Sequence, residues 1–218
     1  MSAVDVLDRF TWLKNSSFLY DGDTTVYLDP WGVPDGAPQA DVIFVTHAHD
    51  DHLSAEDIER VRGEHTRIVT TADVAKDLSG SIEIVSPGDA LEFAGISVDV
   101  VPAYNTAPDR QNFHPKANGW VGYVFTLEGT RIYHSGDTDA IPEMEAIDCD
   151  IAFLPIGGTY TMTAEEAVDA VHKLGPKIVV PMHYGFVAGT PKDMERFKEL
   201  VPDVTIRSFE PTNPFEQR

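Results

Sequence analysis

The sequence predicts an α/β sandwich, with two β-sheets packed face to face and helices on the outside. Two observations predict it. Short apolar runs come first and are then interleaved with helical segments, which is the order of βα units. The apolar run at 41–45 leads into a histidine-rich turn and a helix start, so polar chemistry lies at the carboxyl end of a strand, where α/β folds place ligands. The 218 residues suit one domain, 1–218, with a substantial core.

The first elements follow from local patterns. Residues 10–20 and 24–29 are expected to form a hairpin that turns at Asp21-Gly22-Asp23. After the buried strand at 41–45, Ser54 is expected to cap a helix over 54–63, with Asp57 reaching back to it.

The remaining elements are read in the same way. Strands are expected at 67–70, 82–85, 90–94, 96–104, 120–127, 131–134, 150–156, 177–181 and 204–209, and helices near 72–79, 164–174 and 191–201. Thr163 and Glu166 form a capping box for the helix 164–174, which Gly175 ends. Residues 105–119 show no periodicity, and a loop of this length inside a domain is usually functional or disordered. Its aromatic, His and Lys content favours a functional loop.

The turn at 46–52 holds three of the eight histidines and two carboxylates. In an extended segment His47 and His49 point the same way, so both imidazoles can hold one metal ion. Asp51 and His52 are adjacent and diverge, so they can supply a second ion, as in two-metal hydrolases. Nitrogen and carboxylate ligands suit zinc, and also iron or manganese. The alternative is a solvated polar turn, but packing does not explain three histidines bunched after a buried strand.

These residues carry a resemblance to a known family. His47-x-His49-x-Asp51-His52 resembles the His-x-His-x-Asp-His signature of the metallo-β-lactamase superfamily. Downstream, Gly136-Asp137-Thr138 resembles the element with the metal-bridging aspartate, and Pro181-Met182-His183-Tyr184-Gly185 resembles the element with the last histidine. Within the superfamily, the chain is similar to small hydrolases related to ascorbate-6-phosphate lactonases and to N-acylphosphatidylethanolamine phospholipase D. The resemblance implies the metallo-β-lactamase fold, a four-layer αββα sandwich of two mixed β-sheets flanked by helices.

The resemblance also implies a site for two divalent metal ions, with zinc favoured and manganese or iron as alternatives. His47 and His49 would hold the first ion, and Asp51, His52 and His183 the second, with Asp137 bridging both. The chain departs from the family at Asn105, where the third histidine of the first ion usually stands. Asn105, His114 or both are expected to complete that shell, with His114 preferred because imidazole is the better ligand.

Other residues are assigned roles around this site. Asp29, at the end of the predicted strand 24–29, either supports the metal centre from behind or starts a turn before proline. Asp51 or Asp137 is expected to steer the nucleophile or relay a proton. Lys116 and Arg110 are the nearest cations and are expected to meet an anionic substrate group.

The expected function is hydrolysis of a small ester, lactone or phosphodiester. Tyr160 lies on the loop after the strand 150–156, where it contacts substrate or an oxyanion, or belongs to a plain turn. A second hypothesis is a degenerate member of the fold that binds one metal or a metabolite without turnover. The departure at Asn105 is the feature that supports it.

Composition excludes other classes of function. Sixteen basic and 36 acidic residues give a net charge of −20, which repels nucleic acid and anionic membranes. No apolar run approaches the ~20 residues of a membrane span, and Met1–Asp5 does not resemble a signal peptide. A cytoplasmic protein with a small-molecule substrate and no nucleic-acid or membrane partner is expected, with homo-oligomerisation left open. Cys149 is the one cysteine, so no internal disulfide forms.

Overall fold

Strand β4 (Ala40–Phe44) is buried on both faces, and this pattern sets the layers of the fold. Phe44 points into the core between two sheets, whereas Ile43 packs with Ile58 of helix α2 (Ala55–Val61) on the opposite face. A strand with both faces apolar needs a covering layer on each side. One side of β4 is therefore covered by the second sheet and the other by a helix.

The computed structural model describes residues 2–93 and 95–216. The first sheet has the order β1-β2-β3-β4-β5-β6, antiparallel as far as β3 and parallel from β3 to β6. The elements of this half besides β4 and α2 are α1 (Ala3–Leu7), β1 (Phe10–Lys14), β2 (Ser17–Asp21), β3 (Thr25–Leu28), β5 (Arg62–Thr70), the 3-10 helix η1 (Val74–Asp77) and β6 (Ser81–Ile84).

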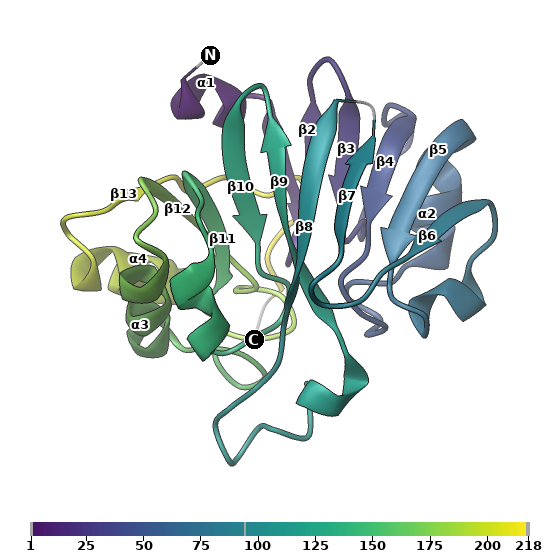
Figure 1. Ribbon diagram of the computed structural model, residues 1–218. Coiled ribbons are helices and arrows are strands. Elements are labelled where there is room, and N and C mark those ends of the chain that lie inside the picture. Colours follow the sequence, from purple (N-terminus) through teal and green to yellow (C-terminus); the bar gives the residue numbers. More distant parts are fainter. Residues whose placement is uncertain (1, 94, 217–218) are drawn as a thin grey trace.

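The second sheet has the order β13-β12-β11-β10-β9-β8-β7, antiparallel from β7 to β10 and parallel from β10 to β13. Its half contains β7 (Ala90–Phe93), β8 (Ile96–Pro102), η2 (Lys116–Asn118), β9 (Val121–Leu127), β10 (Thr130–His134), η3 (Pro142–Ala146), β11 (Ile151–Pro155), α3 (Ala164–Leu174), β12 (Ile178–Met182), α4 (Pro191–Leu200) and β13 (Thr205–Ile206). Helices α3 and α4 lie outside this sheet and α2 outside the other (Figure 1). The predicted four-layer sandwich of two mixed sheets is confirmed.

The helix caps follow local sequence rules in part. Thr163 and Glu166 form the predicted capping box of α3, and Gly175 ends that helix with a left-handed φ of 59°. Ser54 accepts a hydrogen bond from the backbone N–H of Asp57, as predicted for α2. The Asp57 carboxylate does not reach back, however, because it accepts a hydrogen bond from the N–H of Gly32 at 2.9 Å. The Asp57 carboxylate therefore holds the loop that contains Gly32 and does not complete the helix cap.

The helix expected near 72–79 is the short 3-10 helix η1, and the strand expected at 204–209 is limited to β13. Two further predicted boundaries are wrong for identifiable reasons. The expected single strand 10–20 divides into β1 and β2, because Asn15 has a left-handed φ of 50° and its carbonyl accepts from Trp12 Nε1 at 2.8 Å. The helix expected to reach residue 63 ends at Val61, and β5 starts at once with polar residues that pair opposite Ala40. Residue 94, the last of the predicted strand 90–94, lies outside the described residues.

The topology brings distant polar segments to one edge. Strands β3 and β4 are parallel, as are β10, β11 and β12, so the loops after them leave each sheet at the same end. Asp29, the turn 46–52, Asp137 and His183 all follow such strand ends. The long loop between β8 and β9 lies below the same edge in Figure 1. In the described part of the chain, no helix is long and apolar enough to cross a bilayer.

Candidate metal centre

Three imidazoles form the first group of side chains at this edge. His47 Nε2 lies 3.1 Å from His49 Nδ1, so the two rings of the turn face one point. His114, from the loop between β8 and β9, completes the group, and one nitrogen of each ring lies within 4.8 Å of the others. The indole of Trp120 packs against His47 and His49, with ring centroids 4.8 Å apart in each pair. Three imidazoles are a donor set that zinc uses in catalytic sites.

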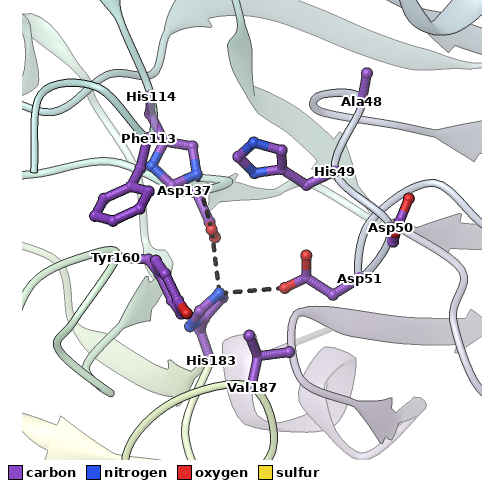
Figure 2. Close-up of a pocket in the computed structure, with 10 residues that line it drawn as sticks. All are labelled: Ala48, His49, Asp50, Asp51, Phe113, His114, Asp137, Tyr160, His183 and Val187. Carbon is purple, nitrogen blue, oxygen red and sulfur yellow. Dashed lines mark ion pairs between the residues drawn. The ribbon is translucent and has the colours of Figure 1, made fainter.

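Asp51, His52, Asp137 and His183 form the second group, again with ligand atoms within 4.8 Å of one another. His183 Nε2 lies 3.4 Å from Asp51 Oδ2 and 3.1 Å from Asp137 Oδ2 (Figure 2). His52 Nε2 lies 3.2 Å from Asp137 Oδ1. Asp137 Oδ2 also lies 3.2 Å from His114 Nε2, so this carboxylate stands between the two groups.

Asp29 holds two of these rings from behind. It is fully buried, and its Oδ2 accepts a hydrogen bond from His52 Nδ1 at 2.7 Å. Thr46 donates its backbone N–H to Asp29 Oδ1 and its hydroxyl to Oδ2, and the same hydroxyl lies 2.9 Å from His47 Nδ1. A carboxylate behind an imidazole fixes the ring's orientation and leaves its other nitrogen for a metal.

Asn105 and His114 are brought together by the long loop. Asn105 Oδ1 accepts hydrogen bonds from His114 Nδ1 at 2.8 Å and from its backbone N–H at 3.1 Å. Asn105 Nδ2 donates to Asp139 Oδ1 and to the carbonyl of Tyr160. The structure therefore places His114, and not Asn105, beside His47. Ligation by Asn105 itself stays a prediction, and in this structure its amide oxygen accepts hydrogen bonds that orient the His114 ring.

Asp139 fixes the start of that loop. Its carboxylate accepts hydrogen bonds from the backbone N–H groups of Thr106 and Ala107 and from Arg110 Nε. Arg110 also pairs with Glu166 at the start of α3, at 2.9 Å. These hydrogen bonds and the pairing with Arg110 offset the free-energy cost of burying the Asp139 carboxylate. The same contacts hold the loop close to the second sheet.

His183 sits on unusual backbone. Its φ is 55°, a left-handed conformation that is uncommon outside glycine. Two glycines accommodate this turn: a Cβ on Gly157 would collide with the His183 carbonyl, and Gly189, at φ 62°, packs on the backbone of Gly157. Strained residues of this kind gather at functional sites, where the surrounding structure enforces them.

Several buried polar atoms at the centre point to a cation. His52 Nε2, His114 Nε2 and Asp137 Oδ1 are each buried without a hydrogen-bond partner in the described structure. Leaving such atoms unsatisfied costs free energy, so they are rare unless a ligand engages them. All three face the two groups described above, and the donor set of imidazole and carboxylate fits a divalent transition ion.

Charge coupling within the centre agrees with this fit. Burial lowers the pKa of His47 well below its usual value, which keeps that ring neutral. Burial also opposes charge on His183, but Asp137 and Asp51 outweigh it and raise the pKa of His183 to about 9. Burial opposes ionisation of Asp137, but His183 and His52 hold its pKa well below the usual value. A divalent cation would displace the protons that these imidazoles carry.

A cavity of about 340 Å³ opens onto the centre (Figure 2). It is lined by Ala48, His49, Asp50, Asp51, Phe113, His114, Asp137, Tyr160, His183 and Val187. Tyr160 therefore lies where substrate contact was expected. Arg110 and Lys116 do not line the cavity, and contact of either side chain with an anionic substrate group stays a prediction. Arg110 is held by Asp139 at 2.8 Å, and Lys116 by Glu143 at 2.8 Å.

Comparisons with known proteins decide the family. Residues 9–183 match the β-lactamase superfamily domain. The chain is 33% identical to a UPF0173 metal-dependent hydrolase of Archaeoglobus fulgidus, over 95% of this chain and 98% of that protein. The chain belongs to the UPF0173 metal-dependent hydrolases of the metallo-β-lactamase superfamily.

Two solved structures of hydrolases that use metal have the same fold. A candidate metal-dependent hydrolase of Parabacteroides distasonis is 34% identical, with a TM-score of 0.84 and 93% of each chain covered. Igni18, a metallo hydrolase of Ignicoccus hospitalis, is 26% identical, with a TM-score of 0.73 and 96% of this chain and 98% of that chain covered. The closer kinship to lactonases and to the phospholipase D stays a prediction, because these relatives do not test it.

Several supports of this UPF0173 site were not found from sequence. Asn15 donates Nδ2 to Asp51 Oδ2 at 2.8 Å, Thr46 joins Asp29 to His47, and Asp139 fixes the loop of His114. Thr46 could have been identified from the sequence, because it is the first residue of the turn 46–52 and directly precedes His47. Asp139 lies outside the motif that contains Asp137, and Asn15 lies inside a segment whose pattern predicts one continuous strand.

Proposed function

We propose that this UPF0173 hydrolase cleaves a small ester, lactone or phosphodiester with two divalent metal ions, zinc being favoured over manganese or iron. The observation that carries the proposal is the pair of donor groups joined by Asp137. His47, His49 and His114 would hold one ion, and Asp51, His52 and His183 the other. The spacing supports a shared carboxylate, since Asp137 Oδ2 lies 3.2 Å from His114 Nε2 and 3.1 Å from His183 Nε2.

When bound, such a pair of ions lowers the pKa of a water toward neutrality and stabilises negative charge that develops on the substrate. The protein supplies orientation and proton handling. Asp51 Oδ2 is fixed by Asn15 Nδ2, while its other oxygen projects toward the open space below His49 (Figure 2). We assign to that oxygen the task of steering the attacking water and accepting its proton.

Tyr160 is placed to act on the substrate. Its ring lines the cavity together with Asp51 and His183 (Figure 2). A phenol at this position can donate a hydrogen bond to the substrate oxygen on which charge develops. The acidic surface, with net charge −20, supports a small-molecule substrate in preference to nucleic acid.

The non-catalytic alternative has lost its main support. It depended on an incomplete first group, with Asn105 in place of a histidine. The position of His114 supplies a third imidazole, and the cavity gives a substrate access to both groups. Both features support turnover over simple binding.

Metal content and hydrolysis, measured on the same preparations, test the proposal. The protein would be purified without chelator, stripped, and reloaded with zinc, manganese or iron. It would then be assayed with a panel of aryl esters, γ-lactones and bis(4-nitrophenyl) phosphate. We expect up to two ions per chain and metal-dependent hydrolysis that Asp137→Asn abolishes. A protein loaded with two ions that hydrolyses none of these compounds, or equal rates with and without metal, would refute the proposal.

A further inference from the structure

The charge of the cavity wall restricts the substrate. Of the described residues that line the cavity, none is Lys or Arg, whereas three are aspartates: Asp50, Asp51 and Asp137. Asp50 is exposed at the rim. Asp51 and Asp137 would face bound metal, but Asp50 has no ion pair among the described residues. A negatively charged group on the substrate, away from the scissile bond, would meet no compensating side chain here.

Arg110 and Lys116 do not supply the cation that the cavity wall lacks, because each is paired with a carboxylate outside the cavity. The Arg110 side chain is buried between Asp139 and Glu166. Lys116 pairs with Glu143 and lies over the Tyr104 ring, 4.3 Å from its centroid. Lys116 lines a separate hollow, whose lining includes none of the seven side chains of the two donor groups.

An apolar wall faces the metal centre instead. Phe113 and Tyr160 meet edge to face, with ring centroids 4.8 Å apart, and Val187 lies below them on the rim (Figure 2). Phe113 is 39% exposed, and the other exposed large apolar residues of the described chain, Val4 and Ile84, line none of the cavity. An exposed aromatic side chain costs free energy in water, and at a cavity rim it is typical of a ligand contact.

We propose that the substrate is an uncharged carboxylic ester or lactone with an apolar flanking group that packs on Phe113, Tyr160 and Val187. This inference rests on the proposed function and narrows it. In the reaction, the oxygen of water bonds to the acyl carbon and the acyl C–O bond breaks. The alcohol oxygen takes up one proton and the other is released, so a carboxylate and an alcohol result, or a hydroxy carboxylate from a lactone.

Matched substrates test the charge requirement. The metal-loaded protein would be assayed with 4-nitrophenyl acetate, butyrate and hemisuccinate, the last two being of similar length but different charge. We expect kcat/KM for butyrate to exceed that for hemisuccinate by about tenfold or more, as is typical when a pocket leaves a charge unpaired. Equal rates for butyrate and hemisuccinate, or preference for hemisuccinate, would overturn the inference.

Variants of the wall test where the flanking group lies. Phe113→Ala should lower kcat/KM for butyrate by about tenfold and for acetate by about twofold, because only the longer chain reaches the ring. Ile84→Ala, an exposed apolar residue away from the cavity, is the matched control and should change neither. Val187→Lys should shift the preference toward hemisuccinate, since it adds the missing cation. A Phe113→Ala protein with unchanged dependence on chain length would contradict the assignment.

The outcomes separate the two proposals. Hydrolysis of bis(4-nitrophenyl) phosphate without hydrolysis of any neutral ester or lactone would leave the two-metal hydrolase standing and overturn the substrate class. Failure to hydrolyse any of these compounds would overturn both proposals.

Discussion

Replacing Asn105 by alanine should weaken metal binding even though it leaves the three imidazoles of the first group, His47, His49 and His114, in the chain. The Asn105 side chain is buried, at 4% exposure, and its amide joins His114 to Asp139 and the Tyr160 carbonyl. Alanine removes the acceptor that faces His114 Nδ1 at 2.8 Å. The ring would then lose the partner that directs its Nε2 toward Asp137.

The size of the effect follows from the bonds lost. Removing an outer partner of a metal-bound histidine typically costs about 10- to 100-fold in metal affinity. The backbone N–H of His114 also loses Asn105 Oδ1 at 3.1 Å, and a buried group left unsatisfied costs about 1–3 kcal/mol. We therefore expect a metal-affinity loss of about 10- to 100-fold and a decrease of about 2 kcal/mol in the free energy of unfolding of the metal-free protein.

Competition with a chromophoric chelator would measure the affinity, and urea unfolding of the metal-free protein would measure the stability. Asn112→Ala, an exposed residue of the same loop, is the control and should change neither value. Asn105→His should not raise metal occupancy, because His114 already supplies the third imidazole. Asn105→Ala with wild-type metal affinity would refute the orienting role, as would a gain in occupancy with Asn105→His.

The remaining predictions concern the centre directly. Chelation should lower the melting temperature measured by calorimetry, because the bound ions stabilise the folded state alone; an unchanged melting temperature would count against a built metal site. His183→Ala should lower kcat by about 100-fold or more with an unchanged circular dichroism spectrum, and Asp137→Asn at least as much; wild-type turnover in either would contradict the ligand assignments. The metal-free protein should lose stability as the pH rises. The pKa of His183 is raised from 6.5 to about 9, so its stabilising charge is fully present below pH 6.5 and lost through about pH 9. The loss should reach up to about 3 kcal/mol in urea titrations at each pH, and a flat profile would contradict the coupling to Asp51 and Asp137.

The layers of the fold could be predicted because they depend on strong local patterns. The apolar run of β4 predicts a buried strand, and the capping box of α3 predicts the start of a helix, without any information on tertiary contacts. The division of β1 from β2 was not predicted from periodicity, because it lies in the left-handed φ of Asn15 and in the hydrogen bond from the Trp12 indole to the Asn15 carbonyl. The early start of β5 was hidden for a similar reason, since its polar first residues join the sheet through pairing with Ala40.

The residues of the centre could be predicted where one motif contains several of them. They could not be predicted where the role of a side chain depends on partners that are distant in the sequence. The turn at 46–52 identifies its own histidines, and the resemblance of 136–138 and 181–185 to family motifs identifies Asp137 and His183. By contrast, the sequence shows that Arg110 is charged but not that Asp139 and Glu166 pair with it. The choice between Asn105 and His114 likewise depends on how a loop folds, which periodicity does not describe.

The division of the two sheets along the chain has a practical consequence. The first sheet is complete at β6 and the second begins at β7, so residues 85–89 connect the last strand of the first sheet to the first strand of the second. Of the seven side chains in the two donor groups, His47, His49, Asp51 and His52 precede this link, and His114, Asp137 and His183 follow it. A gene split within this link would yield two fragments. Each fragment would contain some of the residues of the first donor group and some of the residues of the second. A divalent ion would then promote their reassembly, and complementation of the fragments would report its concentration.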